Sequence, residues 1–213
     1  MVGIGLTYLL GWSSVFVVEK VTITGTPSES VRAHINKISD IEIGEKLARV
    51  NPSSSERKIS KIAWIKGVSI SRNWFSGEIT VAITSREPLA FFNNEQVPGQ
   101  TIDKDGVLFV LPGYVNDELA LISAKSPQSA LKANELFINL PAEFRSSISS
   151  MVATSDNTFT LVKEKENRSI RIRWGDSSEV TLKIAVIEKL LNLPENEGIS
   201  LIDVVAPHAP IVK

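Results

Sequence analysis

The side chains that could carry acid–base chemistry are scarce in this chain. It contains two histidines, His34 and His208, and no cysteine, which excludes disulfides and thiolate metal sites. Asp203, His208 and one of many serines could be combined into a nucleophilic triad, but no serine lies in the G-x-S-x-G pattern of a nucleophile elbow. Phosphate loops, dinucleotide fingerprints and the HExxH pattern are also missing. The sequence therefore predicts a protein that is not an enzyme and has no cofactor or metal.

A short acidic motif, Asp103-x-Asp105-Gly106, resembles the start of a calcium loop. An EF-hand loop needs further oxygen ligands at fixed spacing, ending in a glutamate, and none follows here. Asp-Gly is also a frequent hairpin signal. The motif is therefore interpreted as a turn. His34 falls on the flank of an expected helix and indicates no chemistry either.

Charge is distributed very unevenly along the chain. Residues 1–18 carry no charged side chain, whereas residues 19–213 carry all 23 basic and all 24 acidic ones. The two signs are well mixed there, and the net charge of −1 argues against nucleic acid as a partner, since nucleic acid demands a basic face. This asymmetry predicts a bitopic protein, with one helix in a membrane and the polar chain on one side of it.

The apolar run VGIGLTYLLGWSSVFVV, residues 2–18, predicts an N-terminal transmembrane helix. At about 1.5 Å per residue it reaches roughly 25 Å, the short end of a bilayer span. Gly3, Thr7 and Gly11 recur every four residues, which places small residues on one helix face and lets another helix approach closely. The plainer interpretation is that such residues are simply common in membrane helices.

Two other interpretations of residues 1–18 stay open. A cleaved signal peptide needs a basic n-region and a small-residue cleavage site, and neither is visible. A buried strand or core helix is the other possibility. Because no Lys or Arg precedes the apolar run, charge does not set its orientation. The loss of a cytoplasmic tail from the N-terminus of this sequence would also explain why no basic residue precedes the apolar run.

The membrane-proximal part of the chain predicts a module of three strands with two helices on one sheet face. Thr26 and Asn51 are the expected helix N-caps, because a proline follows each of them. The expected order is strand, helix, helix, strand, strand, in residues 16–24, 26–38, 51–66, 68–72 and 79–83.

The rest of the chain predicts a second module of strands and helices. Arg171 and Arg173 alternate with apolar residues in one expected strand. They form either a docking stripe for an anionic partner or an ordinary solvated sheet face. The expected elements are a helix over 129–144 that Pro141 interrupts, strands 159–162 and 169–174, a helix over 180–193, and a last strand, 199–205.

Several of these segments resemble one known family. The run WIKGVSISRNWFSGEITVAITSREPLAFF, residues 64–92, resembles the second half of a POTRA domain of the FtsQ/DivIB cell-division family. Trp174-Gly175, Lys183 and Ile202-Asp203-Val204 are similar to the β-domain of the same proteins. The resemblance covers essentially the whole chain. It implies an α+β protein with an N-terminal transmembrane helix (1–18), a β-α-α-β-β POTRA module (19–92) and a mixed β-domain with flanking helices (93–213).

The resemblance also implies a function. Such a protein would be a non-catalytic bitopic scaffold of the bacterial divisome, in the cytoplasmic membrane at the septum, with most of its chain extracytoplasmic. Its partners would be FtsB/DivIC-like and FtsL-like bitopic proteins, with other divisome components as further candidates, and membrane lipid through the N-terminal helix. Nucleic acid and small-molecule substrates are not among them.

In this family the C-terminal strands of the β-domain accept a strand from the FtsB/DivIC partner. Asp203 lies in the middle of an apolar run, where a charge guards a sheet edge against indiscriminate pairing. Proline cannot donate to a ladder, so Pro207 and Pro210 argue against strand addition at the last few residues and leave residues 201–205 as the expected open edge. We expect Val204→Lys to break partner binding and leave the fold intact. The implied contact residues are Leu201, Ile202, Asp203, Val204, Val205, Ile211 and Val212.

Two alternatives belong to other functional classes. A POTRA-containing component of protein secretion or outer-membrane assembly would carry a β-barrel, which needs many alternating strands of about ten residues. The chain after Ala90 has too few such strands and two expected helices. A membrane-anchored hydrolase would need the nucleophile motif that is missing here.

Overall fold

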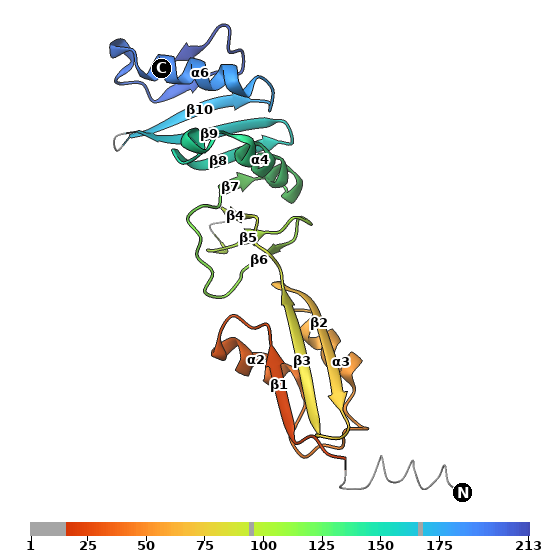
Figure 1. Ribbon diagram of the computed structural model, residues 1–213. Helices are drawn as coiled ribbons and strands as arrows, with labels where there is room; N and C mark the ends of the chain where they lie inside the picture. Colours follow the sequence, from red (N-terminus) through yellow and green to blue (C-terminus); the bar gives the residue numbers. More distant parts are fainter. Residues whose placement is uncertain (1–15, 94–95, 166–167) are drawn as a thin grey trace, which may run out of the picture. The chain divides into compact units, whose positions relative to one another are not determined.

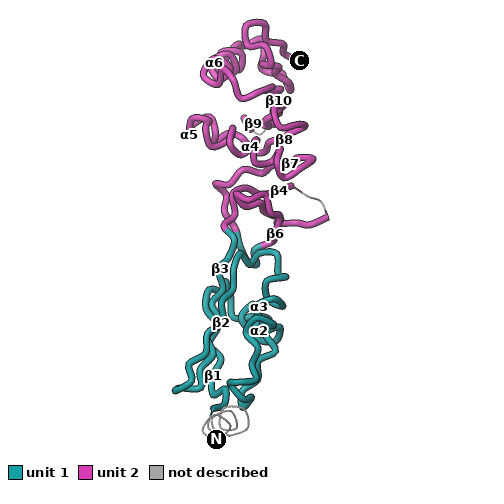
Figure 2. The backbone as a smooth tube through the Cα atoms, turned by 90° about the vertical axis from the view of Figure 1, so that its right-hand side faces the viewer, with its two compact units in different colours: residues 1–86, 111–114 teal, residues 87–110, 115–213 magenta. Residues whose placement is uncertain are grey.

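The computed structural model describes residues 16–93, 96–165 and 168–213. The expected helix-packing residues Gly3, Thr7 and Gly11 lie outside these ranges, as does most of the expected anchor. Among the residues that are described, no helix has the length and apolar character needed to cross a membrane. The chain divides into two compact units, residues 1–86 with 111–114 and residues 87–110 with 115–213 (Figure 2).

The first unit has the β-α-α-β-β order that the sequence predicts. Its described elements are β1 (Lys20–Thr24), α2 (Glu29–Ser39), α3 (Pro52–Ile59), β2 (Ile65–Asn73) and β3 (Glu78–Ser85) (Figure 1). The sheet order is β1-β3-β2, with β1 parallel and β2 antiparallel to the central strand. Both helices lie on the same side of this sheet (Figure 2).

The two helices of this unit begin at polar caps, one of which the sequence misplaced. The Asn51 side chain accepts a hydrogen bond from the Ser54 N–H at 3.1 Å, as expected. The other cap is Ser28 rather than Thr26, because Ser28 has the extended backbone of a cap and its hydroxyl accepts from the Val31 N–H. Pro27 therefore precedes the helix instead of starting it.

The second unit is built on one large mixed sheet. Within the described residues its strand order is β12-β11-β10-β9-β8-β7-β4-β5-β6. It begins at Glu87, ahead of the expected residue 93, because β4 pairs with β5 and β7 of this sheet. Its elements are β4 (Ala90–Phe92), β5 (Thr101–Ile102), β6 (Leu108–Phe109), β7 (Leu121–Ala124), α4 (Pro127–Asn139), α5 (Ala142–Arg145), β8 (Ile148–Ser155), β9 (Thr158–Lys165), β10 (Arg168–Gly175), α6 (Val180–Leu191), a short 3-10 helix (Pro194–Asn196), β11 (Leu201–Asp203) and β12 (Ile211–Val212).

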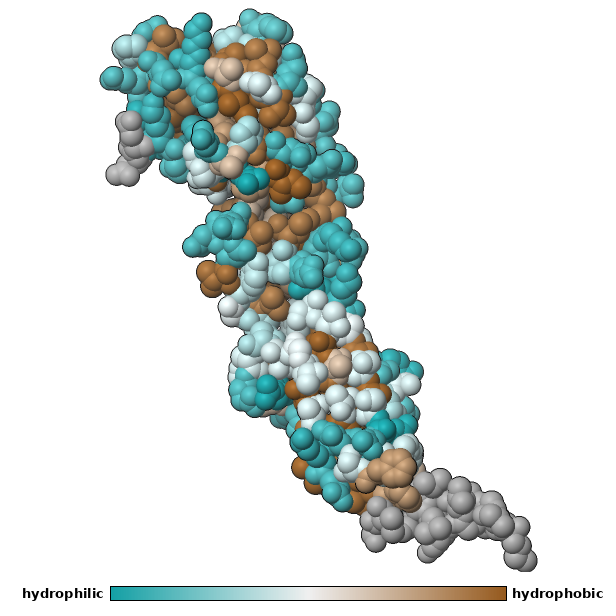
Figure 3. All heavy atoms as spheres, in the orientation of Figure 1, coloured by the Kyte–Doolittle hydropathy of each residue, from teal (hydrophilic) through white to brown (hydrophobic). Residues whose placement is uncertain are grey.

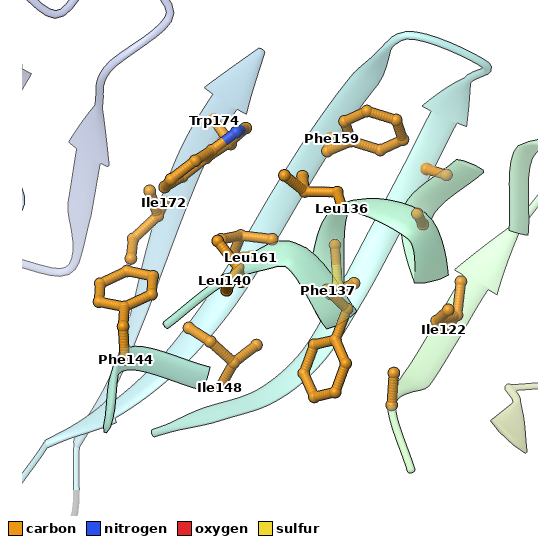
Figure 4. Close-up of a cluster of buried hydrophobic side chains, with 14 of the residues drawn as sticks. Ile122, Leu136, Phe137, Leu140, Phe144, Ile148, Phe159, Leu161, Ile172 and Trp174 are labelled. Atoms are coloured by element: carbon orange, nitrogen blue, oxygen red, sulfur yellow. The ribbon is translucent and has the colours of Figure 1, made fainter. Parts of the chain in front are cut away.

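The core of the second unit lies between one face of this sheet and its helices. Strand residues of β8, β9 and β10 alternate between buried and solvent-facing positions, as period-2 strands do. The inward side chains meet apolar residues of α4, α5 and α6. The ring centroids of Phe144 of α5 and Trp174 of β10 are 6.2 Å apart. Figure 4 shows both rings among the buried side chains of this core. The opposite sheet face is left to solvent or to a partner.

Candidate functional site

The strand that the sequence marks as a binding edge is paired on both sides. β11 runs parallel to β10, with Ile172 beside Ile202, and antiparallel to β12, with Ile202 beside Val212. Toward β10, the Ser200 carbonyl accepts a hydrogen bond from the backbone N–H of Arg171 at 2.9 Å. The expectation of an open edge at residues 201–205 is therefore wrong, since β12 covers β11 and is itself the edge.

The backbone of β12 alternates between bonded and outward positions. Lys213 and Leu201 exchange two hydrogen bonds of 3.0 Å, so both backbone groups of Lys213 point toward β11. In an antiparallel ladder the next residue along the strand points the other way. The N–H and C=O of Val212 therefore face outward. Pro210 shares that outward register, so its missing N–H removes no bond to β11.

The solvent-facing side of these strands combines charge and apolar surface. Arg173 pairs with Asp203 at 2.9 Å, and the same carboxylate accepts from the Val205 N–H at 3.1 Å. Arg171 has no ion-pair partner among the described residues and lies beside Leu201 in the register. Ile211 on the edge strand is 56% exposed. One arginine of the predicted stripe is thus neutralised within the sheet, and the other is available.

The expected contact residues fall into two groups. Ile202 and Val204 are fully buried and belong to the hydrophobic core. Val204→Lys would place a charge in that core, so the expectation that it leaves the fold intact is wrong. The remaining residues are at least partly accessible: Leu201, Asp203, Val205, Ile211 and Val212.

A buried lysine holds the turn that leads from β10 into α6. Lys183 is fully buried, and its Nζ donates to the backbone carbonyl of Asp176 at 2.9 Å and to its carboxylate at 3.0 Å. The Nζ also lies 5.4 Å from the Trp174 ring centroid. Hydrogen bonds from Ser178 and then Lys183 lower the pKa of Asp176 to about 2. This cluster ties the first turns of α6 to the end of β10.

The residues that could have formed a triad are not brought together. The Asp203 carboxylate is engaged by Arg173. His208 Nε2 lies 3.6 Å from Glu179 instead. The acidic motif closes a turn, since Asp103 Oδ1 accepts from the backbone N–H groups of Asp105 and Val107 at 2.9 Å each.

The structure also shows a serine–lysine contact that the sequence does not reveal. Lys163 Nζ donates to the Ser147 hydroxyl and lies 4.8 Å from the Phe144 ring centroid. Burial lowers the pKa of Lys163. The Ser147 hydroxyl donates to the Phe144 carbonyl at 2.5 Å, so its proton is committed to the backbone. The contact therefore ties the end of α5 to β9. It joins residues far apart in the chain, and no spacing rule could have found it.

Comparison with known proteins decides between the functional classes that the sequence left open. Residues 16–86 match the model of the FtsQ-type POTRA domain. Residues 90–204, more than half of the chain, match that of the C-terminal domain of cell division protein FtsQ/DivIB. This chain belongs to the FtsQ/DivIB family. The family is a non-catalytic family of cell division proteins whose members act in the divisome with other division proteins.

Two relatives of the family are named cell division protein FtsQ. The one from Streptomyces bingchenggensis is 27% identical over 227 residues, covering 100% of this chain and 82% of its own length. The one from Salinibacter ruber is 24% identical over 120 residues, covering 54% of this chain and 45% of its own. The family assignment confirms the expectation of a cell division protein without enzymatic activity.

Proposed function

We propose that this protein is a bitopic membrane scaffold of the bacterial divisome that links FtsB/DivIC- and FtsL-type partners to septum assembly. Residues 1–18 would be its transmembrane anchor in the cytoplasmic membrane. The POTRA module that follows, up to Arg86, and the β-domain from Glu87 onward would be its two extracytoplasmic modules. The family assignment supports the place in division. The uncharged N-terminal segment supports the anchor. Tethering confines the partner-binding edge to the membrane surface, where its effective concentration is high.

The outward edge of β12 is the observation that carries the binding mode. Val212 offers one N–H and one C=O there, which is the pattern that an added strand needs. On the solvent-facing side of the same sheet, Ile211 of the edge strand offers an apolar contact, and the available guanidinium of Arg171 on β10, two strands further in, offers a cationic one. We infer that an FtsB/DivIC-type strand pairs with β12 and that an acidic side chain of the partner meets Arg171.

Two substitutions test this edge in the full chain. Val212→Pro removes the outward N–H but none of the inward ones, so strand addition fails while the ladder between β11 and β12 stays. Ile211→Lys replaces the exposed apolar contact with a charge. We expect each to weaken binding of a cognate FtsB/DivIC-type partner about tenfold or more, which is roughly 1.4 kcal/mol. Binding is measured with both proteins reconstituted in the same membranes.

The matched control is Ile138→Lys on α4, because Ile138 and Ile211 are equally exposed, at 56% each. It introduces the same charge at an apolar surface position away from the edge, and we expect unchanged affinity. Equal affinities for Ile211→Lys, Val212→Pro and the unmodified chain would refute binding at β12. Equal losses in all three variants would show a general effect of surface change instead.

A further inference from the structure

The tip of the β2–β3 hairpin is an exposed aromatic surface at one end of the first unit. The tip, residues 73–77, reads NWFSG and carries no charged side chain. Phe75 is fully exposed and Trp74 is 37% exposed. The Asn73 side chain accepts from the backbone N–H groups of Phe75 and Ser76, so the turn is held by Asn73 and not by the aromatic side chains. The fold of the hairpin therefore does not depend on the Phe75 ring.

This tip lies where the uncharged N-terminal segment enters the unit. The Glu19 N–H donates to the Gly77 carbonyl at 2.9 Å, and a side chain at Gly77 would meet the Val17 carbonyl at 2.7 Å. The Phe16 ring packs edge-on against Trp74, with centroids 6.1 Å apart. Figure 3 shows hydrophobic residues at this end of the unit. The tip and the end of the uncharged run are thus one continuous surface.

A second segment holds the same entry point. Val17 pairs with Lys46, and the Leu47 N–H donates to the Phe16 carbonyl at 3.1 Å. The guanidinium of Arg72 donates to the Leu47 carbonyl at 2.8 Å and lies 5.5 Å from the Trp74 ring centroid. The described residues 16–19 are therefore fixed between a loop and the hairpin, and the tip stays beside the point of entry.

We propose that this tip docks into the headgroup region of the bilayer that residues 1–18 enter. The proposal rests on the membrane anchor of the proposed function and adds a second contact between the first unit and the lipid. Tryptophan favours the membrane–water interface because its ring is both apolar and a hydrogen-bond donor. Phe75 inserts its ring below Trp74, and Arg72 keeps its charge at the level of the phosphates. The anchor and the tip together would fix the orientation of the first unit on the membrane, whereas the anchor alone would let the unit rotate.

The experiment uses the full chain, whose lack of cysteine permits a single labelled thiol. Ser76→Cys puts a fluorescent label on the tip and keeps both aromatic residues. Val115→Cys labels a position that is 80% exposed in the other unit. The proteins are reconstituted in vesicles of phosphatidylcholine and phosphatidylglycerol. We expect quenchers attached to the lipid to quench the label at position 76 several-fold more than the label at position 115. When Trp74→Ser and Phe75→Ser are introduced into the Ser76→Cys chain, we expect the label at position 76 to be quenched no more than the label at position 115.

The outcomes separate the tip from the anchor. Equal, weak lipid quenching at positions 76 and 115, in a chain that resists alkaline extraction, keeps the anchor and overturns the tip contact. Strong quenching at position 76 in a chain that alkali releases supports the tip and refutes the anchor. Release without quenching overturns both. A label at position 76 shielded from water and from the lipid quenchers alike would show a protein contact instead, and would overturn the proposal.

Discussion

The two units protect the edges of their sheets in different ways. In the first unit, edge strand β2 is long, and the Glu56 carboxylate of α3 accepts from the Ile70 N–H at 2.9 Å. That bond occupies a donor that an added strand would need. In the second unit, edge strand β12 has only two residues, and the outward N–H of Val212 makes no hydrogen bond within the described residues. One edge is long and blocked, whereas the other is short and open. Of these two edges, β12 is the one better suited to accept an added strand.

The cores of the two units differ as well. Apart from Trp64, the first is aliphatic, with Ile35, Ile59 and Ile79 fully buried at its centre. The second contains buried aromatic rings and a fully buried lysine. An aliphatic core is stabilised by burial alone, whereas the second core also depends on the satisfied charge of Lys183. Charge changes near β10 and α6 should therefore affect the second unit and leave the first untouched.

The largest effect is expected from Val204→Lys. It places an ammonium group in the core of the second unit, which we expect to lower the free energy of unfolding of that unit by about 4 kcal/mol or more. Hydrogen exchange measured by mass spectrometry follows both units in one sample. Ile211→Lys, the exposed control, should change protection little. Loss of protection in the first unit would contradict the separation of the two cores.

A smaller loss of stability is expected from changes to the ion pair between Lys183 and Asp176, and the two residues should differ. Asp176→Ala leaves Lys183 buried with only the backbone carbonyl as acceptor, and we expect it to cost roughly 1–3 kcal/mol in the stability of the second unit. Lys183→Met leaves a carboxylate that is 47% exposed and stays hydrated, so we expect a smaller loss or none. Equal losses for the two variants would show that the pair acts through packing only.

The Asp176 carboxylate, which accepts hydrogen bonds from Ser178 and then from Lys183, gives the second unit a dependence on acid. The pKa of Asp176 falls from its ordinary value of 3.8 to about 2 on folding. The stability that it contributes is therefore complete above pH 3.8 and is lost as the pH falls toward 2. In Asp176→Ala this part of the acid dependence should disappear, while that of the first unit stays the same.

The smallest effect tests the blocked edge. Glu56→Ala frees the Ile70 N–H, and we expect a loss of about 1 kcal/mol in the first unit, because one partly buried hydrogen bond is removed. The freed edge should also self-associate, which sedimentation of the chain in detergent measures against Glu42→Ala as control. A variant that stays monomeric would show that Glu56 does not guard the edge.

Most of the first unit was predictable from local signals. Alternating apolar residues in β3 and the Asn51-Pro52 start of α3 are properties of short segments, and both predictions were right. The missed strand β8 has register shifts near each end, which break the period-2 pattern. β12 has no pattern of its own, since its two residues form a strand only by pairing with β11. The sequence also could not show which face Val204 points to, because the expected strand 199–205 is apolar on both faces.

The path of the chain between β10 and β11 affects the order in which the last strands join the second sheet. β11 lies parallel to β10, so the chain must cross back along the sheet through the segment that contains α6 before β11 can pair. β12 can pair only after β11 is in place. In a chain that emerges N-terminus first, the outward groups of Val212 therefore become an edge only after the rest of the second sheet has formed. A partner that needs this edge would recruit finished copies and pass over unfinished ones, which makes docking a checkpoint on folding.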